Sequence, residues 1–273
     1  MNFVSAQLPE NEERRAEAVE RTGLIDSNQA SLFNIYCELA KEITNYEAVL
    51  FQLFDSKERC YLAEIQPELD KTQNTHTRRP KDGSVCAHVL LDTSPLIAFD
   101  VSKHEITKTH SNEKGVKSYI GFPIIDKNNY ALGMVCMMTF SEIKELSQDK
   151  IDLVEKLIKK AAHQIDVMTD QKQLTSDRII NAIDIFNQKT GIKDMMIFKN
   201  FIHVCNKMNI SKDIEKILIE KGLCKSNQDS NLELTQIGKN IQDNMGLHSK
   251  IMKNVKFEGK QANDLIEGML DEL

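Results

Sequence analysis

Two side chains with nucleophilic and acid–base chemistry, Cys86 and His88, lie two residues apart in the sequence. A thiol beside an imidazole becomes a nucleophile when the imidazole accepts the thiol proton. The surrounding pattern predicts a short helix over residues 85–91, and on a helix the side chains of residues i and i+2 do not face each other. We therefore expect a buried thiol and a hydrogen-bonded histidine here, and we assign no catalytic residue.

The cysteines and histidines of the chain do not have the spacing of a metal site. Neither a C-x-x-C pair nor an H-x-x-x-H pair occurs in the 273 residues, and such pairs supply neighbouring ligands in many zinc sites. Most of the cysteines stand in apolar stretches, as is typical of reduced thiols in a cytoplasmic protein. We expect no metal, and the sequence identifies no cofactor.

Composition and charge exclude several classes of protein. The longest nearly unbroken apolar run, residues 130–140, is far shorter than the roughly 20 residues that span a bilayer. Residues 1–15 contain no apolar core of a signal peptide, so we expect a cytoplasmic protein with no membrane partner. The net charge of −6 falls entirely in residues 1–174. Neither part of the chain has the basic excess of a strong nucleic-acid binder.

The elements of residues 1–170 must position Cys86 and His88. Two helical stretches come first, one ending at Gly23 and one starting near Ser27. A long amphipathic helix over residues 146–171 closes the region. The patterns between them predict strands, at residues 48–54, 60–65, 95–101, 119–125 and 130–140. This order predicts an α+β domain with a mostly antiparallel sheet flanked by helices.

Two polar segments of this region, residues 67–82 and 102–117, are longer than ordinary loops. Long loops are usually functional, and binding residues concentrate on loops that a rigid scaffold holds. We expect the two segments to roof a ligand pocket on the sheet. The residues expected near this pocket are Cys86, His88, Phe99, Asp100 and Tyr119.

Five motifs in the same region resemble those of GAF domains, the small-ligand sensor fold related to PAS. Residues 8–15 and 23–26 are similar to the leader LPxNExxR…GILD of bacterial sensor-type GAF modules, and residues 84–88 resemble their SFCAH box. Residues 95–100 resemble PLVVPD, and residues 119–124 with 131–136 resemble YAGAPL…ALGTLC. The resemblance, which runs from residue 8 to about residue 166, implies a GAF/PAS-like fold and a small-molecule ligand of unknown identity.

Two more specific GAF activities are alternatives. GAF-fold reductases of free methionine sulfoxide have a cysteine near the position of Cys86. Their working cysteine lies in the loop that here spans residues 102–117 and contains none, so a thiol-dependent reductase is the less favoured alternative. Cyclic-nucleotide binding is another alternative, since the loop offers positive charge to an anion, although we favour a solvated loop. The charges come from Lys103, Lys108, Lys114 and Lys117.

Residues 191–273 form a second, mostly helical region, joined to the first by a helical linker over residues 171–190. A helix over residues 211–221, a hairpin around residues 227–231 and the sequence Leu234-Thr235…Gly238 resemble a winged helix. The positive and negative charges of that helix cancel. Arginine is the side chain that most often recognises guanine in DNA, and no arginine follows Arg178. We expect a winged-helix-like module that binds DNA weakly or not at all, so that a protein partner is favoured over DNA.

The long helix carries an apolar stripe with the 3–4 spacing of a parallel dimeric coiled coil. The same stripe is suited to covering the sheet of its own domain, so a homodimer and an intramolecular core are both open. Its residues are Ile151, Val154, Ile158, Ala161, Ile165 and Met168.

Together these features predict a non-enzymatic cytoplasmic signalling protein. About 100 residues after position 171 are too few for a kinase ATPase domain, and no GGDEF motif occurs. In this interpretation a small ligand biases the GAF-like sensor, and the linking helix carries the change to the second module. A GAF-regulated, DNA-binding transcriptional regulator is the alternative.

Overall fold

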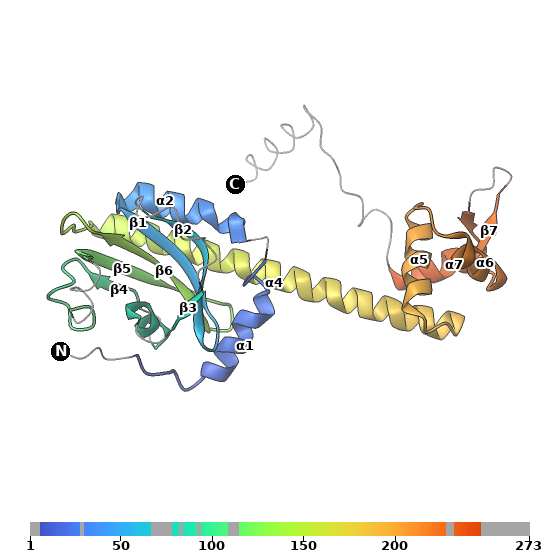
Figure 1. Cartoon of the computed structure of the whole chain (residues 1–273), viewed down its shortest axis with the longest axis horizontal. Coiled ribbons are helices and arrows are strands. Elements are labelled where there is room, and N and C mark those ends of the chain that lie inside the picture. Colours follow the sequence, from blue (N-terminus) through green and yellow to red (C-terminus); the bar gives the residue numbers. More distant parts are fainter. Residues whose placement is uncertain are drawn as a thin grey trace, which may run out of the picture. The chain divides into compact units, whose positions relative to one another are not determined.

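The computed structural model describes residues 6–27, 30–66, 78–81, 84–91, 94–108, 115–227 and 232–246. The chain divides into two compact units, Met1–Lys172 and Gln173–Leu273, which are described separately (Figure 1). Of the helices in the described ranges, none combines the length and the apolar character that crossing a bilayer requires.

A six-stranded antiparallel sheet forms the centre of the first unit, in the order β3-β2-β1-β6-β5-β4. Its strands are Ala48–Phe54 (β1), Glu58–Ile65 (β2), Arg78–Pro80 (β3), Leu96–Ala98 (β4), Ser118–Ile125 (β5) and Ala131–Thr139 (β6). The α+β fold with an antiparallel sheet is therefore confirmed. Two details differ from the sequence-based prediction. β4 is shorter, and β3 lies in a segment that was expected to be a loop. Two arginines and a proline have no strand pattern of their own, so β3 forms only by pairing with β2.

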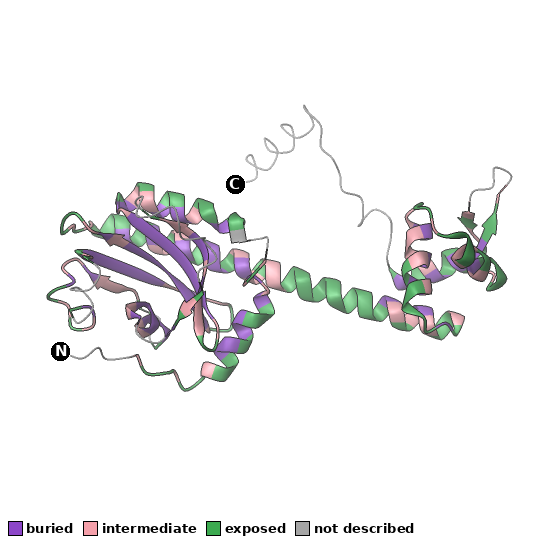
Figure 2. Cartoon of the chain, in the orientation of Figure 1, coloured by how far each residue is buried: buried purple, intermediate pink, exposed green. Residues whose placement is uncertain are grey.

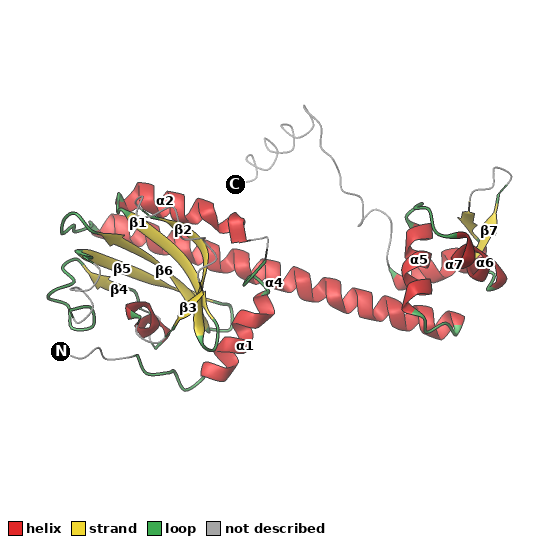
Figure 3. Ribbon diagram, viewed as in Figure 1, coloured by secondary structure: helices red, strands yellow, loops and turns green. Residues whose placement is uncertain are grey.

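One face of the sheet is covered by the helices α2 (Asn34–Thr44) and α4 (Gln148–Thr190) (Figure 3). Tyr36 of α2 donates a hydrogen bond of 2.6 Å to Gln164 of α4, so the two helices lie side by side. The apolar stripe of α4 packs on this face, and all of its residues from Ile151 to Ile165 are buried. The structure thus places the stripe on its own sheet. The homodimer, which the sequence pattern predicts along residues 151–186, stays a prediction for the exposed part of that range.

The next stretch of α4, residues 170–181, is exposed at every position (Figure 2). Beyond it, Ala182 and Phe186 are buried again, in the core of the second unit. One continuous helix therefore contributes side chains to two separate hydrophobic cores.

The opposite face of the sheet is covered by η2 (Val85–Leu90), a 3-10 helix where the sequence predicts a short helix. Ser84 caps this helix, because its hydroxyl accepts a hydrogen bond from the backbone N–H of Cys86 at 3.2 Å. The side chains of Cys86, Val89 and Leu90 are buried against the sheet.

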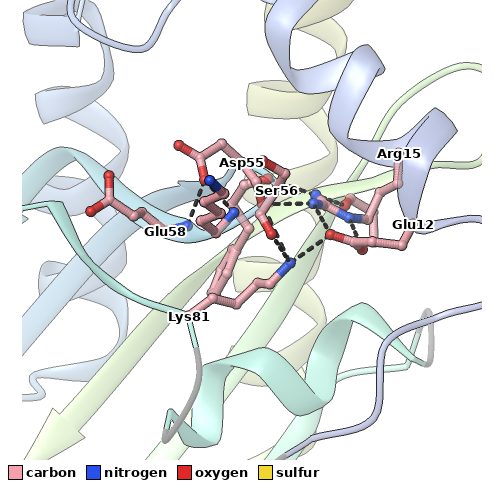
Figure 4. Close-up of polar contacts among 9 residues, drawn as sticks. Glu12, Arg15, Asp55, Ser56, Glu58 and Lys81 are labelled. Atoms are coloured by element: carbon pink, nitrogen blue, oxygen red, sulfur yellow. Dashed lines mark hydrogen bonds and ion pairs between the residues drawn. The ribbon is translucent and has the colours of Figure 1, made fainter.

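A network of buried charges attaches α1 (Glu12–Thr22) to one end of the sheet (Figure 4). Arg15 is 1% exposed and forms an ion pair of 2.7 Å with Glu12. The buried Lys81 also pairs with Glu12, at 2.5 Å, and donates to the carbonyl oxygen of Ser56. The Arg15 guanidinium also donates to three backbone carbonyl oxygens, those of Phe54, Asp55 and Ala131. Because charges are buried only when they are paired, this network explains the charged leader of the sequence.

In its described residues, the second unit has three helices and a hairpin that follow the end of α4 and surround a small apolar core. Its elements are α5 (Met195–Cys205), α6 (Lys212–Glu220), β7 (Cys224–Ser226), β8 (Leu232–Leu234) and α7 (Gln236–Met245). Phe186 of α4 packs against Phe198 and Phe201, with ring centroids 5.4 and 5.2 Å apart. The mostly helical character of this region is as predicted, whereas its identity as a winged helix stays a prediction. The amphipathic pattern of residues 260–270 predicts one more helix, and those residues lie outside the described ranges.

The sequence Leu234-Thr235…Gly238 has a physical explanation in this unit. The Thr235 hydroxyl donates to the carbonyl oxygen of Gly222 at 2.6 Å and accepts from the N–H of Gly238 at 3.1 Å, which caps α7. A Cβ on Gly238 would lie 2.2 Å from the carbonyl oxygen of Leu223. Glycine is required here because α7 approaches the backbone that leads into β7.

We expect Gly238→Ala to destabilise the second unit by about 1–3 kcal/mol, because the added methyl group overlaps a backbone oxygen. The measurement is urea unfolding of the full chain, with hydrogen exchange of the α7 amides reporting on this unit. Ile237→Ala is the matched control, since Ile237 is 59% exposed on the same helix turn, and we expect it to change stability by less than about 0.5 kcal/mol. Equal stability of the two variants would contradict the proposed overlap.

Candidate functional site

A group of polar and sulfur-containing side chains is enclosed between the sheet and η2. Side chains alternate between the two faces of a strand, and this directs Gln52 of β1, Tyr119 of β5 and Cys136 of β6 toward η2. Cys86 projects from η2 onto the same place and is 5% exposed, whereas Cys136 is 0% exposed. We call these four residues and Arg59 of β2 the polar cluster.

Hydrogen bonds connect the members of the polar cluster. The thiols of Cys86 and Cys136 belong to the same buried cluster on this face of the sheet. The Tyr119 hydroxyl lies 3.3 Å from the Cys86 sulfur, and the Gln52 amide nitrogen lies 3.5 Å from the Cys136 sulfur. Arg59 donates to the Ser84 hydroxyl at 3.0 Å, and its Nη1 is 4.0 Å from the Cys86 sulfur. A cation therefore lies directly beside a buried thiol.

These contacts shift the pKa values of the two thiols in opposite directions. The neighbouring Cys136 thiol holds the pKa of Cys86 well below its usual value, with help from the Arg59 guanidinium and the Tyr119 hydroxyl and against the effect of burial. The neighbouring Cys86 thiol, together with burial, raises the pKa of Cys136. Burial also raises the pKa of Tyr119, which stays a hydrogen-bond donor at neutral pH. Cys86 is thus the thiol that ionises first.

Two arginines and a tyrosine lie next to the polar cluster, toward the β3 edge of the sheet. Arg59 and Arg79 are directly opposite each other in the β2–β3 register. Both guanidinium groups lie over the ring of Tyr61, at 5.8 and 5.9 Å from its centroid. All three side chains are half-buried. The site therefore combines a concentrated positive charge with a buried pair of thiols.

The structure brings some of the five predicted pocket residues together and separates others. Cys86 and Tyr119 are in contact, and His88 lies half-buried on the same short helix. Phe99 packs against the apolar core on the other face of the sheet. It directly follows Ala98, which faces η2, and successive side chains of an extended chain point to opposite faces. Asp100 is held in a local turn by Ser102 and Lys103.

The two segments expected to roof the pocket are described only in part. Residues 67–77 and 109–114, including Lys114, lie outside the described residues. Lys103, one of the lysines considered for an anion, pairs with Asp100 at 2.9 Å.

Sequence reasoning did not identify Gln52, Arg59, Arg79 or Cys136 as site residues. One signal was present for Gln52, which is an amide in the middle of the otherwise apolar run of residues 48–54. A polar residue in such a strand must find a buried partner. Cys136 had no distinguishing signal, because it is one more small apolar residue in a buried strand.

A separate surface pocket of about 210 Å³ lies where α4 meets the β5–β6 turn. Charged groups of its lining contact one another, since Lys159 pairs with Glu155 at 2.7 Å and the backbone N–H of Lys127 donates to Asp166 at 3.1 Å. The Lys127 side chain pairs with Asp170, which is outside the lining. Burial raises the pKa of Asp166. Since these charges are paired within the chain, we regard the polar cluster as the stronger candidate site.

Comparison with known proteins agrees with this architecture. The model of the GAF domain family matches residues 29–165, a range that contains the whole sheet and the polar cluster. The chain therefore belongs to the GAF family, as the sequence motifs predicted, and GAF domains are small-ligand sensing and regulatory modules. No curated protein matches the sequence.

Solved structures with a similar fold include photoreceptor domains and one enzyme. The blue-light-absorbing form of the PixJ GAF domain from Thermosynechococcus elongatus is 14% identical, with a TM-score of 0.43 over 63% of this chain and 96% of that one. The chromophore-binding domain of a bacteriophytochrome from R. palustris is 12% identical, with a TM-score of 0.44 over 59% and 62%. A type II free methionine-R-sulfoxide reductase from Thermoplasma acidophilum is 13% identical, with a TM-score of 0.41 over 56% and 96%. At such low identity, their ligands and reactions are not transferred to this chain.

Proposed function

We propose that this protein is a non-enzymatic signalling protein whose GAF unit binds a small anion, with α4 carrying the resulting change to the second unit. The observation that supports the anion is the pair Arg59 and Arg79. Like charges directly opposite each other destabilise two paired strands. Neither guanidinium has a carboxylate partner among the residues that the structure describes. A bound anion would remove this repulsion.

The neighbouring arginine, Arg78, has the opposite environment. It forms ion pairs with three carboxylates, those of Asp26, Asp55 and Glu58. Acidic side chains are thus available at this edge of the sheet, yet they pair with the arginine that points away from Tyr61. The contrast supports a ligand-binding role for the other two arginines.

The chemistry around Arg59 and Arg79 indicates the class of ligand. A guanidinium is planar and donates two parallel hydrogen bonds to a carboxylate or a phosphate. The Nε of Arg59 is buried and has no hydrogen-bond partner within the described part of the chain. Burial raises the pKa of Tyr61 to about 12, so this phenol stays neutral at physiological pH and supplies no counter-charge. The ligand that fits is a small carboxylate or phosphate.

The path to the second unit is helix α4. Leu174, Ile179 and Ile180 are exposed on the stretch between the two cores. Exposed apolar side chains on a long helix favour pairing with a second copy, so the proposal includes a homodimer through residues 170–181. Ligand binding would then change how the two copies of the helix pair.

A protein partner is favoured over DNA for the second unit. The surface of α6 alternates in charge, with exposed lysines beside exposed acids. Phosphate contacts require a basic surface, which this helix does not present. The exposed residues are Lys212, Asp213, Lys216, Ile219 and Glu220.

The experiment is calorimetric titration of the full chain with inorganic phosphate, succinate and citrate at low salt. We expect at least one of these anions to bind, and Arg59→Gln and Arg79→Gln each to weaken its binding by about tenfold or more, since a charged hydrogen bond contributes roughly 1.5–3 kcal/mol. Arg78→Gln is the matched control and should leave the affinity unchanged. An equal loss in all three variants, or no binding of any anion, would contradict the proposal. A native mass spectrum of the purified protein reports a retained anion and the subunit count together.

A further inference from the structure

We propose that the anion bound by the GAF unit also carries a hydroxyl group, and that Gln52 is the residue that selects for this hydroxyl. The inference rests on the proposed function, because it names the class of anion that Arg59 and Arg79 would hold. The starting observation is the amide oxygen of Gln52. The side chain is completely buried, and no group in the described ranges lies within hydrogen-bond distance of its Oε1.

The other end of the same amide is poorly satisfied as well. Its Nε2 donates to the Cys136 sulfur at 3.5 Å, and a thiol sulfur is a weak acceptor. Burying an amide without good partners is costly, whereas an apolar side chain of the same shape carries no such cost. Gln52 therefore lowers the stability of the ligand-free sheet, and a polar group that donates to Oε1 would remove this penalty.

Strand register places Gln52 beside the two arginines of the proposed anion site. Gln52 is directly opposite Tyr61 in the β1–β2 register. Arg59 precedes Tyr61 by two positions, so Gln52 and Arg59 are diagonal neighbours on the face toward η2, within reach of long side chains. The Arg59 and Arg79 guanidinium groups both lie over the Tyr61 ring. A ligand held by the arginines would thus lie next to the Gln52 amide.

The two buried atoms without partners at this place differ in their hydrogen-bonding character. Arg59 Nε is a donor, and Gln52 Oε1 is an acceptor. An ionised carboxylate or phosphate oxygen accepts from Arg59, but it has no proton to donate to Gln52. The ligand that satisfies both atoms therefore carries a hydrogen-bond donor in addition to its anionic group.

The local charge selects the kind of donor. An ammonium group at this position would lie beside the Arg59 and Arg79 guanidinium groups, and like charges repel. A hydroxyl is neutral and donates one hydrogen bond, which Oε1 accepts. The ligand class is therefore a small hydroxy acid, or a phosphate monoester that has a free hydroxyl.

The test compares ligands that differ by a single hydroxyl, through calorimetric titration of the full chain at low salt. The pairs are succinate against each enantiomer of malate, and ethyl phosphate against 2-hydroxyethyl phosphate. We expect the hydroxylated member of at least one pair to bind about tenfold more tightly, since a hydrogen bond to a buried acceptor contributes roughly this factor. Aspartate, which has an ammonium in place of the malate hydroxyl, should bind no more tightly than succinate.

The outcomes separate this inference from the anion site on which it rests. Binding with equal affinity within both pairs would leave the anion site standing and would overturn the selection of a hydroxyl. Tighter binding of aspartate than of malate would overturn it as well. If none of these compounds bound, the anion site itself would be contradicted, and the inference with it.

Variants assign the preference to Gln52. Gln52→Met keeps the length of the side chain and removes the acceptor, so it should abolish the difference in affinity between the two members of a pair. Arg79→Gln should weaken both members by the same factor and keep the difference, and Arg78→Gln should change neither affinity. A preference for the hydroxyl that survives in Gln52→Met would overturn the role of Gln52.

Urea unfolding of the ligand-free proteins distinguishes selection of a ligand from a structural role. We expect Gln52→Met to unfold at the same urea concentration as the parent or at a higher one, because the change removes a buried oxygen without a partner. A clearly lower midpoint in Gln52→Met would show that the amide stabilises the folded chain by itself, and it would overturn the inference.

Discussion

Replacement of Arg15 by leucine should lower the free energy of unfolding of the first unit by about 3–5 kcal/mol, the cost of breaking a buried ion pair by removing one partner. The guanidinium is buried and satisfies three carbonyl oxygens as well as Glu12. A leucine would leave these acceptors without their donor, next to the end of β1. Domains are stable by only about 5–15 kcal/mol, so this is a large part of the total.

Arg14→Leu is the matched control for this prediction. Arg14 is the preceding residue of the same helix and is exposed, so its loss should change stability by less than about 0.5 kcal/mol. Chemical unfolding of the full chain, followed by circular dichroism and by hydrogen exchange in β1 and β6, measures both. If the two variants were equally stable, the network in Figure 4 would have no stabilising role.

Replacement of Ile158 by aspartate should unfold the first unit, with an expected cost of more than about 4 kcal/mol for an unpaired buried charge. Ile158 is 1% exposed and packs in the core between α4 and the sheet. Leu153→Asp is the control, because Leu153 is on the same helix and is 50% exposed. It should remain folded.

The same pair of variants decides what the apolar stripe of α4 does. Light scattering and circular dichroism on both proteins report the subunit count and the folded state. A folded, monomeric Ile158→Asp protein would contradict the intramolecular core and would show that the stripe faces a second copy. Loss of the β-sheet signal in Ile158→Asp alone would agree with the structure.

Local sequence patterns are enough to predict most of the elements of this protein. The alternation and apolar runs of residues 48–54, 119–125 and 130–140 predict the central strands, because β-branched and apolar residues suit a buried strand. Ser84 and Thr235 predict helix starts, since each has a hydroxyl that caps the following N–H groups. The GAF family also follows from the sequence, through short motifs in the right order.

The candidate site depends on residues that are far apart in the sequence. Cys86 stands in a recognisable motif, but Cys136, which lies in the same buried cluster, comes fifty positions later, and nothing near Cys136 marks it. Tyr119 and Cys136 reach the same face of the sheet through the β5–β6 pairing, and η2 brings Cys86 onto that face. Phe99, by contrast, is close to Cys86 in sequence but lies on the other face of the sheet.

The sequence by itself therefore determines the local elements and the family, because capping, alternation and turn chemistry act between residues a few positions apart. Tertiary structure alone decides which face each side chain occupies and which charges find partners. The α4 stripe has the same spacing whether it covers a sheet or a second helix, and Arg59 and Arg79 become a pair only when β3 aligns with β2. Such outcomes depend on strand register and on the space between packed elements, and neither is encoded in a short stretch of residues.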